Sequence, residues 1–239
     1  MTWIILLALI TGSASSTKSF ETDTLKTANG NPLKITFIGH GSLLINFNGQ
    51  TIYIDPVSDY ADYPTLPKAD VILITHEHAD HLDPKAISAL EKNKTILIAN
   101  PSSQQKLGKG TALKNGEQLK PTSYLELEAV PAYNTTPGRD VYHPRHRDNG
   151  YILTIDGTRI YIAGDTEDIP EMQKLKDIDI AFLPVNQPYT MTVAQAAHAA
   201  QMVMPHVLYP YHYGNTDIQS LKDSLKNTPS IDVRIRQLQ

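Results

Sequence analysis

The sequence predicts a layered fold in which strands and helices intermix, of the α/β or α+β class. Three observations support this prediction. Apolar runs of strand length recur from Leu33 to the end of the 239-residue chain, with turn residues between them. Asn48-Gly49 and Asp156-Gly157 each separate two such runs, and these pairs are the strongest short-range signal for a hairpin. Helical patterns follow several of the strands, as in sheets covered by helices.

The first half of the chain is expected to contain a hairpin, further strands and one helix. Asp83 is a good N-cap and Pro84 a good first helical residue, so we expect a helix from there to about Lys92. The run 71–75 is continuous and largely apolar, as in a strand that is buried on both faces. The strands predicted here are residues 34–38, 43–47, 51–54, 71–75 and 95–99.

The second half repeats the mixture of strands and helices. Thr192 is expected to cap an alanine-rich helix that ends near Met204, and a second helix covers 217–226. Residues 133–149 are predicted to form a long polar loop. The strands predicted here are residues 125–130, 151–155, 158–162, 178–183, 207–211 and 233–235.

One internal resemblance links the halves. Asn48-Gly-Gln-Thr-Ile-Tyr-Ile-Asp55 parallels Asp156-Gly-Thr-Arg-Ile-Tyr-Ile-Ala-Gly-Asp165, and in both an aspartate follows the second strand of a hairpin. Two hairpins can resemble each other by chance. Alternatively, the chain has two related halves whose strand ends carry polar residues to a shared cleft.

The N-terminal residues differ from the rest. An apolar run of eight residues precedes Thr11-Gly-Ser-Ala-Ser-Ser16, which predicts a signal peptide over residues 1–14, although the n-region lacks Lys and Arg. An uncleaved anchor or a buried strand is the alternative. Residues 15–32 are expected to be a poorly ordered lead-in, and residues 33–239 the folded domain. We therefore expect a periplasmic or secreted protein without an integral membrane segment in the mature chain.

Composition excludes several classes of protein. The hydrophobic content of 41% and the charged content of 19% are ordinary for a globular domain. The net charge of −4, without a long basic run, argues against nucleic acid as a partner. The chain has no Cys, which excludes disulfides and a lipid-modified cysteine.

The segment Ile74-Thr-His-Glu-His-Ala-Asp-His-Leu-Asp83 carries the strongest functional signal. His76 and His78 stand two apart, on one side of an extended segment, so both can reach one cation. Asp80 and His81 follow in a tight turn and can reach a second point. Imidazole and carboxylate ligands suit zinc, and also iron or manganese. We also single out Asp165 and His212, which end later strands.

These residues resemble the metallo-β-lactamase superfamily, which implies a four-layer αβ/βα sandwich over about residues 33–239. The signature is His76-x-His78-x-Asp80-His81 followed by Gly164-Asp165 and His212-Tyr-Gly. Gly39-His-Gly-Ser42, Ile54-Asp-Pro56 and Ala132-Tyr-Asn134 are similar to short metal-dependent hydrolases related to ascorbate-6-phosphate lactonase and, more distantly, to the phospholipase D that acts on N-acyl ethanolamine phospholipids.

The resemblance implies a role for each residue. His76 and His78 bind the first metal, Asp80, His81 and His212 the second, and Asp165 bridges the two. A hydroxide between the metals is the nucleophile, and Asp80 is the catalytic residue that orients it or passes a proton to the leaving group.

One expected ligand of the first metal is missing. The superfamily usually has a third histidine at the end of the strand that here reads Leu127-Glu-Ala-Val-Pro-Ala-Tyr-Asn134. The candidates are His143, His146, His40, or Asn134 with water, and His143 is preferred. A centre with a single metal on the Asp80 side is the alternative.

Other residues are predicted to support the site. Arg145 and Arg147 suit the recognition of a small anionic substrate, although a solvated basic loop is the alternative. His40 is a candidate proton shuttle or supporting donor, or a turn histidine. Asp55 is expected to orient a ligand histidine through its ring N–H.

The sequence therefore predicts a hydrolase with one or two zinc ions that cleaves an ester, lactone or phosphodiester bond in a small molecule or lipid. A β-lactam hydrolase is one alternative. The other is a non-enzymatic or redox metal-binding protein of the same fold, in which iron would replace zinc.

Overall fold

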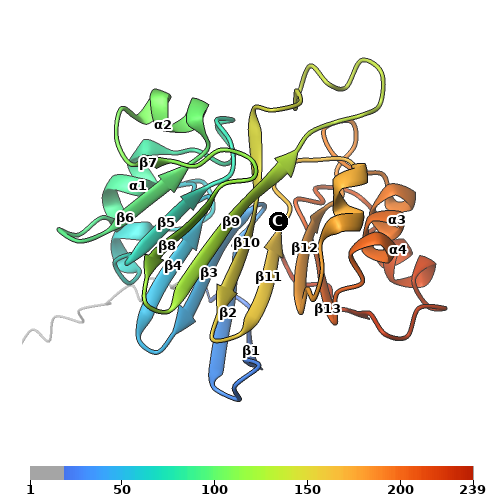
Figure 1. The fold of residues 1–239 in the computed structure, drawn as a ribbon, viewed down its shortest axis with the longest axis horizontal. Helices are drawn as coiled ribbons and strands as arrows, with labels where there is room; N and C mark the ends of the chain where they lie inside the picture. Colours follow the sequence, from blue (N-terminus) through green and yellow to red (C-terminus); the bar gives the residue numbers. More distant parts are fainter. Residues whose placement is uncertain (1–18, 239) are drawn as a thin grey trace, which may run out of the picture.

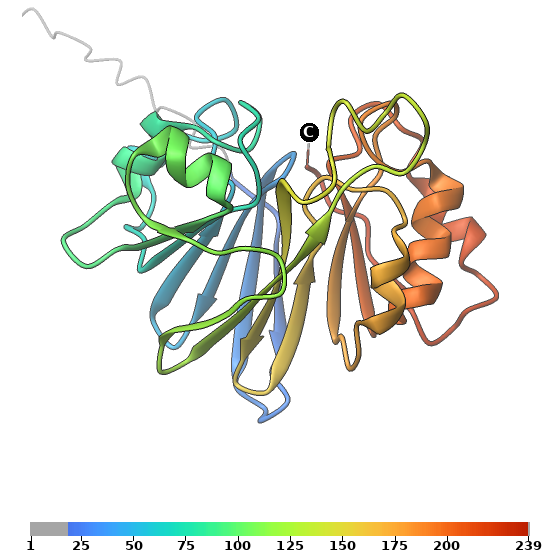
Figure 2. The same ribbon diagram turned by 45° about the horizontal axis from the view of Figure 1, so that its top comes forward.

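The computed structural model describes residues 19–238, which form two seven-stranded sheets with helices on their outer sides. Figure 1 shows helices α1 and α2 beside the first sheet and α3 and α4 beside the second. Figure 2 shows the sheets between these two groups of helices. This is the four-layer αβ/βα arrangement that was expected. The predicted signal peptide, residues 1–14, lies outside the described residues.

The strands of the first sheet follow the order of the chain. The first three pairings are antiparallel and the next three are parallel. The strands are β1 (Thr22–Lys26), β2 (Pro32–Gly39), β3 (Ser42–Phe47), β4 (Gln50–Ile54), β5 (Val71–Ile74), β6 (Ile96–Ala99) and β7 (Thr111–Ala112). A 3₁₀ turn (Tyr63–Thr65) and helices α1 (Pro84–Leu90) and α2 (Pro101–Leu107) complete this half.

The second sheet has the same pattern of pairings, three antiparallel and then three parallel. Its strands are β8 (Gln118–Thr122), β9 (Leu125–Ala132), β10 (Asp148–Ile155), β11 (Thr158–Ile162), β12 (Ile180–Pro184), β13 (Val207–Tyr211) and β14 (Asp232–Val233). A 3₁₀ turn (Pro170–Lys174) and helices α3 (Val193–Val203) and α4 (Gln219–Ser224) belong to this half. The repeated topology supports two related halves, with hairpins β3–β4 and β10–β11 in corresponding places.

Strand β5 is apolar at every position because both of its faces are buried. Val71 and Leu73 belong to the main core, which also contains side chains of the second sheet. Ile72 and Ile74 belong to a smaller cluster that includes residues of α1. All four side chains are fully buried, and each contributes about 1.5–3 kcal/mol relative to an exposed position. The strand is therefore fixed on both faces just before the histidine segment begins.

Two of the predicted helix starts are confirmed, whereas the helix expected over 217–226, α4, begins two residues later, at Gln219. Asp83 caps α1 by accepting a hydrogen bond from the backbone N–H of Lys85. Thr192 caps α3 in a capping box with Gln195. Helix α2 was not predicted, although Asn100 caps it and Pro101 opens it. The signal that predicted α1, an N-cap residue followed by proline, was therefore present for α2 as well, and both helices are seven residues long.

The prediction of a poorly ordered lead-in was wrong for residues 22–26, which form β1. This strand pairs with β2, and Asp23 holds the guanidinium of Arg236 and the hydroxyl of Tyr209 near the other end of the chain. The long polar loop also ends earlier than predicted, because β10 begins at Asp148. None of the helices within residues 19–238 combines the length and apolarity needed to cross a bilayer.

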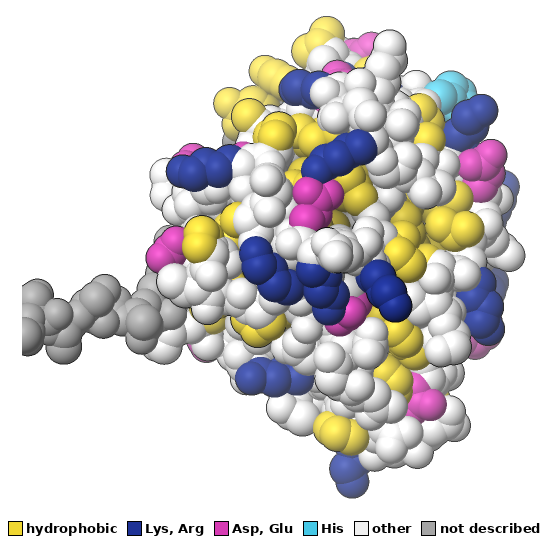
Figure 3. All heavy atoms as spheres, turned by 90° about the vertical axis from the view of Figure 1, so that its left-hand side faces the viewer, with side chains coloured by type: hydrophobic (Ala, Val, Ile, Leu, Met, Phe, Trp, Pro, Cys, Tyr) yellow, Lys and Arg dark blue, Asp and Glu magenta, His cyan; other side chains and the backbone are white. Residues whose placement is uncertain are grey.

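The surface on the side of α1 and α2 carries mixed charge. Figure 3 shows several Lys and Arg side chains close together near the centre of this face, with acidic and apolar side chains around them.

Candidate metal centre

The candidate ligands meet where several strands end at one edge of the sheets. Asp55 follows β4, His76 comes two residues after β5, Asp165 lies three residues after β11, and His212 follows β13. Each of these strands has a parallel neighbour. The carboxyl ends of parallel strands share one edge, which is why α/β proteins place their sites there.

Hydrogen bonds fix the histidine segment after β5. The carbonyl of Thr75 accepts a bond from the N–H of Asn149 in the opposite sheet. The carbonyl of His78 then accepts bonds from the N–H groups of His81 and Leu82, which closes a tight turn. This turn reverses the chain, so that His81 points back toward His76.

The first ligand cluster consists of His76, His78 and His143. One ring nitrogen of each lies within 4.8 Å of the others. The ring centroids of His143 lie 5.0 Å from that of His76 and 4.8 Å from that of His78. His143 is buried although it comes from the long loop. Of the candidates for the third ligand of the first metal, His143 is therefore the one that lies beside His76 and His78. The alternative His146 is exposed and belongs to none of the ligand clusters found in residues 19–238.

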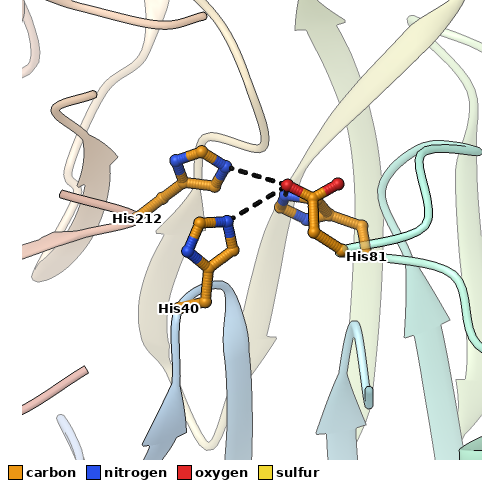
Figure 4. Close-up of side chains that lie close together, drawn as sticks. His40, His81 and His212 are labelled. Carbon is orange, nitrogen blue, oxygen red and sulfur yellow. Dashed lines mark hydrogen bonds and ion pairs between the residues drawn. The ribbon is translucent and has the colours of Figure 1, made fainter. Parts of the chain in front are cut away.

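The second cluster consists of His40, Asp80, His81 and His212, whose ligand atoms also lie within 4.8 Å of one another. Figure 4 shows the three histidines converging. Oδ2 of Asp80 lies 3.2 Å from Nε2 of His40 and 3.6 Å from Nε2 of His212. His40 is therefore in direct contact with the cluster and is not only a turn residue.

Asp165 lies between the two clusters. Its Oδ2 is 3.4 Å from Nε2 of His143 and 3.1 Å from Nε2 of His212. Its Oδ1 is 3.4 Å from Nε2 of His81. A buried carboxylate that faces both groups of imidazoles can be shared by two cations.

Three of the histidines are oriented by neighbouring oxygens. Nδ1 of His81 lies 2.8 Å from Oδ2 of Asp55, which is fully buried. Nδ1 of His143 lies 3.0 Å from Oδ2 of Asp148. Nδ1 of His76 lies 3.0 Å from the hydroxyl of Thr75. A bond to Nδ1 leaves Nε2 available as the ligand atom, which is the usual support of a metal-binding histidine.

The chemistry of this set fits a bound cation. Nε2 of His76, Nε2 of His81 and Oδ1 of Asp165 are buried and have no hydrogen-bond partner among the described residues. Buried polar atoms are normally satisfied, so unpaired atoms that converge on one place need a partner. Imidazole and carboxylate are ligands that divalent zinc, iron and manganese accept.

The charges of the side chains in the centre also fit a bound cation. Burial alone lowers the pKa of His212, but Asp165 and Asp80 outweigh it and raise that pKa to about 10. Burial opposes ionisation of Asp165, yet His212 and His81 hold the pKa of its carboxyl well below the usual range. Burial lowers the pKa of His76 strongly, so its ring is neutral. His212 is therefore protonated when no metal is bound, and a cation bound at its ring nitrogen would displace that proton.

The backbone around the centre is strained. His40, Asp55 and His212 have φ angles of 53°, 43° and 47°, in the left-handed region that non-glycine residues seldom adopt. Gly41 is needed for a different reason. A Cβ there would lie 2.8 Å from Cε1 of His81, so any larger residue would displace that ring.

Arg145 and Arg147, the two candidates for anion recognition, both have carboxylate partners in the chain. Arg147 donates from Nε and Nη2 to the carboxylate of Asp148, at 2.7 and 2.9 Å. Arg145 lies 2.7 Å from Oε1 of Glu171. Asn134 donates to two carbonyl groups and is not in a ligand cluster. These residues therefore support the loops around the centre.

A cavity of about 390 Å³ opens onto the clusters, a size typical of small-ligand sites. Five of its lining residues belong to the two clusters, a sixth is Asp165, and the other three are Tyr142, Asn186 and Tyr189. Tyr189 was a candidate cleft residue from the sequence, whereas Tyr142, Asn186 and Asp148 were not identified. For Asp148, a carboxylate five residues after a candidate ligand was an available signal. Tyr142 and Asn186 lie in loops and carried no such pattern.

Comparison with known proteins agrees with this geometry. Residues 34–212 match the family described as "Beta-lactamase superfamily domain". A UPF0173 metal-dependent hydrolase of Archaeoglobus fulgidus is 31% identical over 193 residues, which cover 76% of this chain and 83% of that protein. One from Ligilactobacillus salivarius is 31% identical over 209 residues, 82% of this chain and 93% of that protein.

Solved structures extend the comparison. A metal-dependent hydrolase from Parabacteroides distasonis superposes with a TM-score of 0.91 at 69% identity, over 92% of this chain and 100% of that one. Igni18, a metallo hydrolase from Ignicoccus hospitalis, gives 0.74 at 25% identity, over 86% and 95% of the two chains. YhfI from Bacillus subtilis superposes on this chain with a TM-score of 0.71 at 15% identity, over 87% of this chain and 97% of that one. This likeness shows the shared fold.

The matched segment begins before His40 and ends at His212, so it contains both ligand clusters. The chain belongs to the metallo-β-lactamase superfamily and, within it, to the UPF0173 family of metal-dependent hydrolases.

Proposed function

We propose that this chain is a dinuclear hydrolase that cleaves an ester, lactone or phosphodiester bond in a small molecule or lipid. Zinc is the expected metal, with iron and manganese as alternatives. The observation that carries the proposal is the position of Asp165, whose carboxylate faces His143 and His212 from opposite clusters.

Each cluster has a defined place in the proposal. His76, His78 and His143 would hold one cation, and Asp80, His81 and His212 the other, with Asp165 common to both. When bound, the cations supply a water of lowered pKa and polarise the carbonyl or phosphoryl group under attack. The narrower kinship to ascorbate-6-phosphate lactonase stays a prediction.

Asp80 is the residue to which we assign proton movement. Its side chain is 44% exposed, whereas that of Asp165 is 2% exposed, so Asp80 is the carboxylate that a substrate can reach. Its contacts with His40 and His212 use Oδ2. We assign Oδ1 to orienting the attacking water and passing a proton to the leaving group.

The test is metal removal followed by selective restoration. Purified protein would be treated with a chelator, reloaded with zinc, iron or manganese, and assayed on esters, lactones, phosphodiesters and β-lactams. We expect activity to disappear and to return with the preferred metal. Hydrolysis that persists after metal removal by the chelator would contradict the proposal. Iron binding without hydrolysis would favour a redox protein.

Two variants sharpen the test. Asp165→Asn removes the shared carboxylate and should lower both metal content and activity. His206→Ala changes an exposed histidine whose partner is Asp179, just before β12, and should leave both unchanged. If the two variants had the same metal content and the same activity, the assigned metal centre would be wrong.

A further inference from the structure

The cavity above the ligand clusters has an aromatic rim. The rings of Tyr142 and Tyr189 lie edge to face, with centroids 5.1 Å apart and planes at 75°. Both residues line the cavity, and Tyr189 is one of the few large apolar residues that are well exposed, at 45%. An exposed aromatic pair beside a reaction centre offers a surface for a planar or apolar group.

Hydrogen bonds hold this rim in place. The side-chain amide of Asn134 donates to the carbonyl of Tyr189 at 2.7 Å and to that of Arg139 at 3.2 Å. It thereby joins the two loops that carry the tyrosines. Nη2 of Arg147 donates to the carbonyl of Tyr142 at 2.7 Å. The pair is therefore built into the structure, and little ordering cost remains when a ligand arrives.

The same cavity lacks a free positive side chain. None of its lining residues, all of which belong to the described chain, is Lys or Arg. The nearby arginines are engaged by Asp148, Glu171 and Glu167. Apart from the cations themselves, no Lys or Arg among these lining residues offsets the charge of an anionic group.

We propose that Tyr142 and Tyr189 form a subsite for an uncharged aryl or alkyl group adjacent to the scissile bond. The substrate class is then a carboxylic ester or lactone with an apolar substituent. In its hydrolysis, water adds to the acyl carbon, the acyl C–O bond breaks, and the alcohol oxygen leaves with a proton. This inference rests on the proposed function and narrows its substrate.

The first experiment compares variants on matched esters. On phenyl butyrate, Tyr142→Ala and Tyr189→Ala of the zinc-loaded protein should each lose roughly tenfold in kcat/KM, the usual scale for losing part of an apolar pocket. On methyl butyrate the loss should stay below about twofold on the same reasoning. Tyr142→Phe and Tyr189→Phe keep the rings and serve as controls with near-normal rates.

The second experiment tests charge. Wild-type protein should hydrolyse phenyl butyrate faster than 4-carboxyphenyl butyrate, whose anionic group would meet the rim. A preference for the carboxylated ester, or equal losses by the alanine variants on the phenyl and methyl esters, would overturn the subsite.

The third experiment does not depend on catalysis. Binding of 2-naphthol to metal-free protein would be measured by calorimetry for wild type and for both alanine variants. Weaker binding by the variants supports the subsite even if no ester is hydrolysed, in which case the proposed function alone fails. Unchanged binding, together with unchanged ester selectivity, refutes the subsite while leaving metal-dependent hydrolysis intact.

Discussion

Replacing Asp55 by asparagine should disable His81 as a ligand without touching the ligand itself. Oδ1 of Asp55 accepts the backbone N–H of Thr75 at 2.8 Å, and Oδ2 accepts the Thr75 hydroxyl at 2.6 Å and lies 2.8 Å from Nδ1 of His81. In the variant, the amide oxygen must face the backbone N–H, because an NH₂ group cannot accept it. The NH₂ group then faces His81.

That exchange changes the tautomer of the imidazole. An NH₂ donor beside Nδ1 requires Nδ1 to accept, so the proton moves to Nε2, the atom that faces Asp165. A protonated Nε2 cannot bind a metal. Loss of such a supporting partner costs roughly 10–100-fold in metal affinity, or about 1.4–2.7 kcal/mol. The mismatch in a fully buried site should also lower the unfolding free energy of metal-free protein by about 1–3 kcal/mol.

Competitive titration with a chromophoric chelator measures the zinc affinity directly. Asp179→Asn is the matched control, because Asp179 also accepts a backbone N–H and contacts a histidine, but lies just before β12 at the opposite end of the sheet. We expect normal zinc affinity for the control and a loss for Asp55→Asn. A folded Asp55→Asn protein with wild-type affinity would refute the tautomer argument.

Three further predictions follow from the same structure. Gly41→Ala would put a methyl group 2.8 Å from Cε1 of His81, so zinc affinity should fall in the same titration, and an unchanged isotherm would count against this. Zinc at a hundred times its Kd should stabilise the protein by about 2.7 kcal/mol and raise Tm by roughly 5–11 °C in calorimetry; the absence of a shift would contradict a preformed centre. Burial acts to raise the pKa of Asp23, but hydrogen bonds from Arg236 and Tyr209 together with the charges of Arg236 and Arg234 outweigh it and lower that pKa below 3.8, so these contacts stabilise above about pH 4 and their contribution disappears as the pH falls through the lowered value. Asp23→Asn should therefore make urea stability less dependent on pH between pH 5 and pH 2, and an unchanged profile would disprove it.

The part of the centre nearest in sequence was predictable because local geometry determines it. His76 and His78 share a side of one extended segment, and Asp80 and His81 follow in a turn, so their proximity needs no tertiary information. Asp165 and His212 were recognisable because strand ends gather at one edge of a sheet. That Asp165 faces both clusters follows only from the packing of the two sheets.

His143 and the aromatic rim illustrate what sequence patterns do not determine. The loop after β9 carries no periodicity, and the position of His143 depends on a bond to Asp148, which begins the next strand. The role of the two arginines could not be determined from the sequence for a related reason. A guanidinium in a loop suits a substrate anion or a carboxylate of the chain equally well, and only tertiary structure brought Asp148 and Glu171 within reach.

The repeated topology explains how one centre comes to need two different aspartates. Asp55 and Asp165 follow corresponding hairpins of the two halves, β3–β4 and β10–β11. In the first half, the carboxylate of Asp55 contacts Nδ1 of His81 and fixes the ring. In the second half, the carboxylate of Asp165 faces Nε2 of the same ring. Since His81 lies between them, with Nδ1 toward one and Nε2 toward the other, exchanging the roles would require the whole histidine segment to move. A duplicated fold thus supplies both the ligand and its support from equivalent strand ends.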